Sequence, residues 1–133
     1  MARYVIDAPT LLHVVDAGLT PGASVRLVAP NRIRSEALEL LLQDVAAGRR
    51  TEREALEAHE RLTEVAMRLL GDRVSRRISW KLAREHGWET LRDAEYLAVA
   101  RLQADALVTV DAALADKARD VVPLAPLEAL QQD

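Results

Sequence analysis

Four acidic residues, far apart in the sequence, stand at positions where carboxylates could do chemistry. Asp7 follows the apolar segment RYVI and Asp111 follows ALVTV, and both segments are typical of buried strands. Asp93 begins an apolar helical stripe that continues at Tyr96, and Glu36 lies at the edge of another buried helical face. An ionised group away from water is costly, so buried carboxylates are normally paired or bound to a metal ion.

Each acid also has a plain structural interpretation. Asp is a favoured N-cap, so Asp7 and Asp111 could each cap the helix that follows. Thr90 and Asp93 have the spacing of a capping box. Glu36 could be an ordinary solvated residue on a helix surface. Taken singly, none of the four positions requires a functional site.

A convergence of these carboxylates at one site would require a cation. Two carboxylates about 4 Å apart repel by about 4 kcal/mol at an effective dielectric constant near 20. The chain has no Cys and only three scattered His, so the available ligands are oxygens. Oxygen ligands suit Mg²⁺ or Mn²⁺ rather than zinc. On the Glu36 helix, Asp44 is the alternative acid because it lies on the buried stripe, although near the far end.

The elements around these acids predict an α/β fold with a mostly parallel sheet. Apolar strands that alternate with helices are typical of a parallel sheet covered on both faces, and ligands bind at the carboxyl ends of its strands. We expect strands at 3–7, 24–30 and 106–110, helices at 9–18, 31–47, 51–70, 73–87, 91–104 and 112–118, and an apolar edge or tail segment at 121–127.

Local signals place several of the helix ends. Asn31 is a possible N-cap, and Thr51 with Glu54 has the pattern of a capping box. Gly71 and Gly87 are expected to end the helices that precede them.

Composition limits the classes of protein that the chain can belong to. Its 133 residues fit a single domain, 1–133, and the absence of Cys excludes disulfides and thiol nucleophiles. The net charge of −3 argues against a broad electrostatic nucleic-acid binder. No segment has the pattern of a signal peptide or the length of a membrane span, so we expect a cytoplasmic protein. The glycines match no phosphate-binding loop.

Four motifs together resemble the PIN-domain nucleases, and among them the VapC-type toxin ribonucleases. These are YVIDAPTLL, VAPNRIRSEALELL, TLRDAEYLAVAR and ALVTVDAALADKA, which occur in the order and spacing of that family over nearly the whole chain. The pair DAEYLAVA and LVTVD is the most specific part of the match. The resemblance implies a PIN-like three-layer α/β/α sandwich with a mostly parallel central sheet.

The resemblance also implies an activity and a set of partners. Asp7, Glu36, Asp93 and Asp111 correspond to the four acids that bind Mg²⁺ or Mn²⁺ and support RNA hydrolysis, and Thr109 to the hydroxyl residue beside the last acid. We expect Asp7 and Asp93 to be direct metal ligands. The protein would be the toxin of a type II toxin–antitoxin pair, a homodimer that binds a cognate antitoxin.

The chain departs from the family pattern at Pro9, where Ser or Thr is common. Thr10 could supply a hydroxyl from the next position. No aromatic cluster for stacking RNA bases is visible, so RNA-binding residues are not assigned. One predicted helix carries a basic stripe, which either binds RNA phosphates or is an ordinary solvated helix face. The stripe consists of Arg73, Arg77, Lys81 and Arg84.

Two other functions remain open. Ala83 and Gly87 have the spacing of a helix-turn-helix DNA binder, although Asp93 and Glu95 would then bring negative charge toward phosphate. Alternatively, the domain is a catalytically silent PIN-like module that acts through a protein partner. The apolar faces of helices 31–47 and 51–70 would suit such a partner or a homodimer.

Overall fold

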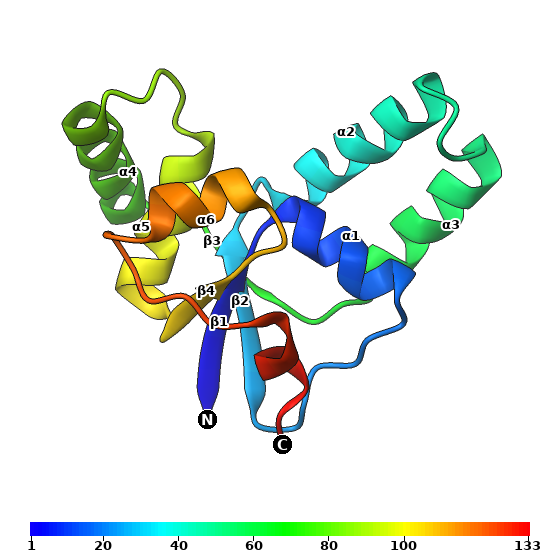
Figure 1. Cartoon of the computed structure of the whole chain (residues 1–133), viewed down its shortest axis with the longest axis horizontal. Coiled ribbons are helices and arrows are strands. Elements are labelled where there is room, and N and C mark those ends of the chain that lie inside the picture. The colour runs from blue at the N-terminus through cyan, green and yellow to red at the C-terminus, as the bar shows by residue number, and fades with distance from the viewer.

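A four-stranded, all-parallel sheet forms the centre of the molecule in the computed structural model, which describes all 133 residues. The strand order is β3-β2-β1-β4 (Figure 1). This arrangement confirms the expected α/β class. The elements are β1 Ala2–Ile6, α1 Ala8–Asp16, β2 Val25–Pro30, α2 Ile33–Ala46, α3 Glu52–Thr63, β3 Arg68–Leu70, α4 Arg73–His86, α5 Arg92–Gln103, β4 Ala106–Val108, α6 Ala112–Ala118 and the 3-10 helix η1 Leu127–Gln131.

Strand register brings distant parts of the chain together at one sheet edge. Ile6 at the end of β1 pairs with Val108 at the end of β4, and Val5 pairs with Val28 of β2. The carboxyl ends of parallel strands lie at the same edge of a sheet. The segments that begin at Asp7 and Thr109 therefore leave the sheet side by side.

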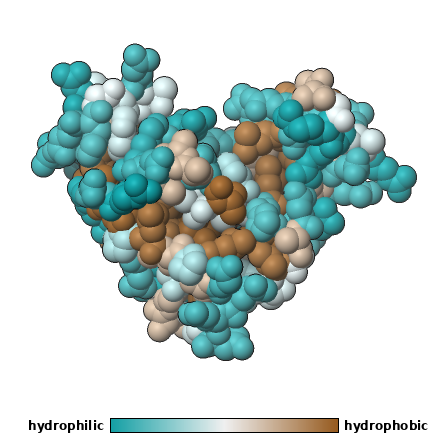
Figure 2. All heavy atoms as spheres, in the orientation of Figure 1, coloured by the Kyte–Doolittle hydropathy of each residue, from teal (hydrophilic) through white to brown (hydrophobic).

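Helices cover both sides of the sheet in the three-layer arrangement that the motifs imply. Figure 1 shows α1, α2 and α3 on one side and α4, α5 and α6 on the other. The hairpin of α2 and α3 projects from the body, and Figure 2 shows a hollow between this arm and the α4 side of the molecule. The strands' carboxyl ends point toward the floor of that hollow (Figure 1).

Helix α5 lies against the sheet with half of its residues buried. It packs against β1, β2 and β4 and buries the run from Tyr96 to Ala100. A recognition helix must instead present a face to the DNA groove. The helix-turn-helix interpretation of this segment is therefore wrong.

Several predicted helix ends are confirmed. The Thr51 hydroxyl accepts from the Glu54 N–H at 3.1 Å, and the Glu54 carboxylate accepts from the Thr51 N–H at 2.9 Å, which completes a capping box. Gly87 ends α4 with φ of 69°, a left-handed conformation that glycine adopts without steric cost.

The predicted helix 51–70 is wrong in its second half. Helix α3 ends at Thr63, and residues 68–70 form strand β3, where Leu69 pairs with Ala29 of β2. Gly71 does not end a helix: it follows β3 where a Cβ would lie 2.2 Å from the Asn31 side-chain nitrogen. A larger residue at this position would require the Asn31 side chain to move.

Two other caps differ from prediction. Asn31 does not cap α2, which begins after Arg32, and no side chain caps α5, which begins after Leu91. The capping box expected between Thr90 and Asp93 is therefore absent.

The segment 121–127 does reach the sheet, where Leu124 forms a single parallel bridge with Leu107 of β4. No helix is long and apolar enough to cross a membrane.

Candidate active site

Asp7 is a buried carboxylate at the end of β1. It stands at the N-cap position of α1 but makes no side-chain capping bond, and only 3% of its surface is exposed. Its Oδ1 accepts a hydrogen bond from the Thr10 hydroxyl, and its Oδ2 accepts one from the Thr109 hydroxyl at 3.0 Å. Burial raises the pKa of Asp7, and these hydroxyl bonds oppose that effect. The capping interpretation of Asp7 is therefore not correct.

The two threonine hydroxyls tie Asp7 to the chain that leaves β4. The Val110 N–H donates to Thr10 Oγ1 at 3.0 Å, and the Asp111 N–H donates to Thr109 Oγ1 at 3.0 Å. Each hydroxyl thus accepts from the backbone and donates to the carboxylate. Thr10 supplies the hydroxyl that Pro9 cannot, as its position in the sequence indicated.

Asp111 lies near Asp7 but is partly engaged in local structure. Its Oδ1 accepts from the Ala113 N–H at 2.9 Å, so Asp111 does cap α6, as its plain interpretation predicted. Its negative charge contributes to the raised pKa of Asp7. The two carboxylates are therefore close enough to act on each other.

Glu36 occupies the first turn of α2, and its side chain is 18% exposed. Arg32 places Nε 3.0 Å from Glu36 Oε1 and Nη1 2.8 Å from Glu95 Oε2, so one guanidinium contacts two acids. Burial raises the pKa of Glu36, and the positive charge of Arg32 opposes the increase. Asp44, the alternative acid on this helix, instead pairs with Arg49 and Arg50.

Tyr96 of α5 connects the region of Asp7 with that of Glu36. It is 1% exposed, and burial, reinforced by the charges of Glu36 and Asp7, raises the pKa of its hydroxyl, which remains a neutral donor. Tyr96 and Glu36 lie close enough for a hydrogen bond between them to raise the pKa of Tyr96 and to oppose the increase at Glu36. Glu36 Oε1 also lies 3.0 Å from Arg32 Nε, so this oxygen already has a charged partner.

Asp93, the second residue of α5, is held by a lysine rather than by a cap. Lys117 of α6 places Nζ 2.8 Å from Asp93 Oδ2, and the Asp93 side chain is 14% exposed. The same ammonium lies 5.4 Å from the centre of the Trp88 ring. Arg92 Nε lies 3.5 Å from Asp93 Oδ1. The charge of Asp93 contributes to the raised pKa of Glu36, so these two acids also lie near each other.

The predicted acids thus form two neighbouring pairs, Asp7 with Asp111 and Glu36 with Asp93. No three acidic or His side chains lie together in a group that could hold a metal ion in this conformation. The charges of Glu36 and Asp93 are instead met by Arg32 and Lys117. The donor set consists of oxygens, the ligand type that a hard divalent cation prefers. Binding one would require Asp93 to separate from Lys117.

The sequence did not reveal three contributors to this region. Lys117 meets Asp93, which is 24 residues away, and no local pattern links the two. Arg32 lies four residues before Glu36, a helical spacing that could have indicated this pair, whereas its contact with Glu95 spans 63 residues. Tyr96 was visible only as part of the apolar stripe.

The fold resembles that of solved structures. PAE2754 from Pyrobaculum aerophilum superimposes with a TM-score of 0.72 and 23% identity, over 97% of this chain and 93% of that one. VapBC-1 from nontypeable Haemophilus influenzae superimposes with a TM-score of 0.58 and 18% identity, over 95% and 98%. No protein-family model and no curated protein matches the sequence. At these identities the likeness establishes the fold alone, which agrees with the PIN-like three-layer α/β/α sandwich that the motifs imply.

Proposed function

We propose that this protein is a Mg²⁺- or Mn²⁺-dependent endoribonuclease, the toxin of a type II toxin–antitoxin pair. The observation that carries the proposal is the position of Asp7, Glu36, Asp93 and Asp111 at the carboxyl edge of a parallel sheet in a VapC-type fold. Ligand sites of open α/β sheets lie at that edge. The motifs around the same four acids support the assignment.

In this proposal Asp7 and Asp93 would hold the ion directly, and Glu36 and Asp111 would complete the site. A bound Mg²⁺ or Mn²⁺ supplies Lewis-acid chemistry, which polarises the scissile phosphate and acidifies a water molecule. Thr109 and Thr10 hold the Asp7 carboxylate in one orientation. Asp111 keeps one oxygen free of capping, so it can orient the attacking water.

The electrostatics of Asp7 agree with such a role. A buried carboxylate with a raised pKa is costly to ionise in the free protein, and a nearby divalent cation would offset that cost. Acids whose pKa is shifted by burial and by neighbouring charges are more common at functional sites than on ordinary surfaces.

The test is cleavage of single-stranded RNA by the wild type and by Asp93→Asn in Mg²⁺ or Mn²⁺. We expect cleavage by the wild type, a loss of at least about 100-fold in Asp93→Asn, and no cleavage in EDTA. Asp116→Asn is the matched control, because Asp116 is an exposed acid of α6 that pairs with Arg119. Equal cleavage by wild type and Asp93→Asn, or equal cleavage in EDTA, would refute the assignment.

The proposal includes an antitoxin and a second copy of the chain as partners. The α2–α3 hairpin exposes three leucines, Leu38, Leu42 and Leu56, which are 43%, 68% and 56% accessible. Exposed apolar side chains on a projecting hairpin are typical of a protein-binding surface. Size-exclusion chromatography with light scattering tests for the homodimer, and Leu42→Glu should weaken it.

A second candidate function is a catalytically silent interaction domain. The pairing of Asp93 with Lys117 and of Glu36 with Arg32 favours it, because both acids are already neutralised within the chain. This function predicts no metal-dependent cleavage and no binding of Mn²⁺ by calorimetry, while the hairpin still binds its partner.

A further inference from the structure

The only two tryptophans of the chain line one pocket, at the carboxyl end of α4. Trp80 lies on α4, and Trp88 follows Gly87, whose left-handed conformation turns the chain so that both residues line the same pocket. The pocket measures about 430 Å³, within the range of small-ligand sites, about 300–1,000 Å³. The sequence showed no aromatic cluster, and the fold creates one.

The two rings differ in how firmly they are held. Trp88 stacks on His86 with ring centres 4.7 Å apart and an interplanar angle of 18°, and Lys117 lies near its ring. The Trp88 ring is therefore held in place by His86 and Lys117. Trp80 makes no such contact, and 63% of its surface is exposed. An exposed indole leaves a large apolar face in water, available for another planar group.

Positive charge continues from this pocket along α4. Arg84 lines the pocket, and Arg73, Arg77 and Lys81 follow the same helix face at helical spacing. All four side chains are exposed, and none forms an ion pair with a carboxylate. Five of the 14 residues of α4 are basic and one is acidic, in a chain whose net charge is −3. This concentration of unpaired cations favours an anionic ligand.

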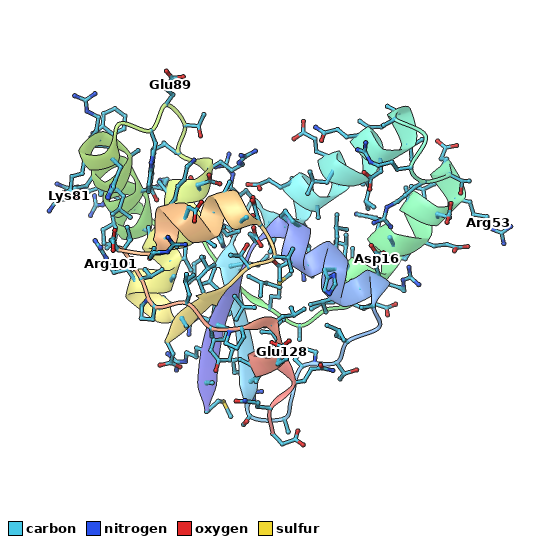
Figure 3. All side chains as sticks on the ribbon, viewed as in Figure 1. Asp16, Arg53, Lys81, Glu89, Arg101 and Glu128 are labelled. Atoms are coloured by element: carbon cyan, nitrogen blue, oxygen red, sulfur yellow. The ribbon has the colours of Figure 1, made fainter.

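The pocket is also connected with the acids of the candidate active site. Trp88 contacts Lys117, and Lys117 in turn contacts Asp93. Thr90 and Leu91, which precede Asp93 on the chain, belong to the pocket wall. Glu89, the acid of the pocket, extends away from the molecule in Figure 3. A ligand in the pocket would therefore lie one side-chain layer from the proposed catalytic acids.

We propose that this pocket binds one nucleotide of single-stranded RNA, whose base stacks on Trp80 and whose phosphates contact Arg84 and the basic face of α4. The combination of an aromatic platform with a row of cations is how proteins hold single strands without reading their sequence. The inference rests on the proposed function in one respect, that the ligand is RNA. It predicts binding that depends on unpaired bases and on salt, and not on a metal ion.

The test measures binding of a fluorescein-labelled single-stranded 12-nucleotide RNA by anisotropy, with EDTA present so that no metal-dependent cleavage occurs. We expect Trp80→Ala to weaken binding about 5- to 150-fold, the range for loss of one stacked base, and Trp80→Phe to retain most of the affinity. Arg84→Gln should weaken binding and lower the slope of log affinity against log salt by about 0.7. The side chains are exposed, so each variant should unfold at the wild-type temperature.

Arg53→Gln is the matched control, because it removes the same charge from α3. Figure 3 shows Arg53 and Lys81 on opposite arms of the molecule. Arg53→Gln should leave RNA affinity unchanged. An RNA duplex of the same sequence should compete at least about tenfold less well, because its bases are already stacked on one another.

Three results would overturn the inference: wild-type affinity in Trp80→Ala, equal competition by the duplex, or no saturable RNA binding by the wild type. The proposed function fails separately. RNA binding that is lost in Trp80→Ala, without cleavage by the wild type, retains the pocket and refutes the nuclease. Conversely, if Asp93→Asn loses cleavage while Trp80→Ala binds RNA normally, the nuclease assignment is retained and the nucleotide pocket is refuted.

Discussion

Replacement of Lys117 by Met should tighten the binding of Mg²⁺. In the structure Lys117 Nζ lies 2.8 Å from Asp93 Oδ2, at the position where a cation would approach this proposed ligand. Methionine keeps a long apolar chain that can pack on Trp88, and it removes the charge. The ion would then no longer compete with an internal cation for Asp93.

The magnitude follows from the geometry and the exposure of the pair. Unit charges 2.8 Å apart attract by about 6 kcal/mol at an effective dielectric constant near 20. The Lys117 side chain is 36% exposed, so water screens the pair and the free lysine regains hydration. Net values for partly exposed charged pairs are about 1–2 kcal/mol. The dissociation constant of Mg²⁺ should therefore fall by about 5- to 30-fold.

Isothermal titration calorimetry of Mg²⁺ into wild type and Lys117→Met measures this change. Lys81→Met is the matched control, because Lys81 is the other lysine of the chain and forms no ion pair. In an Asp93→Asn background, Lys117→Met should have no effect on affinity, as a double-mutant cycle would show. Equal Mg²⁺ affinity in wild type and Lys117→Met, or the same gain in Lys81→Met, would refute the reasoning.

Three further predictions concern the stability of the site and its scaffold. Burial raises the pKa of the Asp7 and Glu36 carboxyl groups in the folded protein above 3.8 and 4.5, their ordinary values in the unfolded chain. Each group therefore contributes its full stability when the pH is below the pKa of the unfolded chain. That contribution is lost as the pH rises through the pKa of the folded protein. Urea unfolding from about pH 4 to about pH 7 should show this loss in the wild type and a smaller one in Asp7→Asn, and identical pH profiles would contradict it. Thr109→Val removes a donor to Asp7 and an acceptor for the Asp111 N–H, which should cost about 1–3 kcal/mol in urea unfolding, and an unchanged midpoint would count against this role. Thr51→Ala breaks the capping box of α3 and should cost about 1 kcal/mol without altering RNA cleavage, whereas a loss of cleavage would show that α3 affects the site.

Sequence reasoning located most of the fold because its signals are local. The strands at 3–7, 24–30 and 106–110 are short apolar runs bounded by breakers, and the structure places β1, β2 and β4 there. The missed strand β3 has only three residues and includes an arginine. It is extended because it pairs with β2 across about 40 residues of sequence, an interaction that the helical spacing of its apolar residues cannot indicate.

The candidate site likewise has one part that the sequence could predict and one part that depends on how distant helices pack. Asp7 and Asp111 could be placed at one edge of the sheet because parallel strands end there, and the Ile6–Val108 pairing agrees with that placement. Thr109 was indicated only by the resemblance of LVTVD to the family motif. The contact of Lys117 with Asp93 could not be predicted, because it depends on how α6 lies against α5. The meeting of Trp80 with Trp88 likewise depends on the turn at Gly87.

The most direct test of the central claim is a crystal structure of the wild-type protein in Mn²⁺, with anomalous scattering used to locate the ion. The account predicts an anomalous peak in contact with the carboxylates of Asp7 and Asp93, and Lys117 displaced from Asp93. No peak at these carboxylates under saturating Mn²⁺, with Lys117 still bound to Asp93, would contradict it.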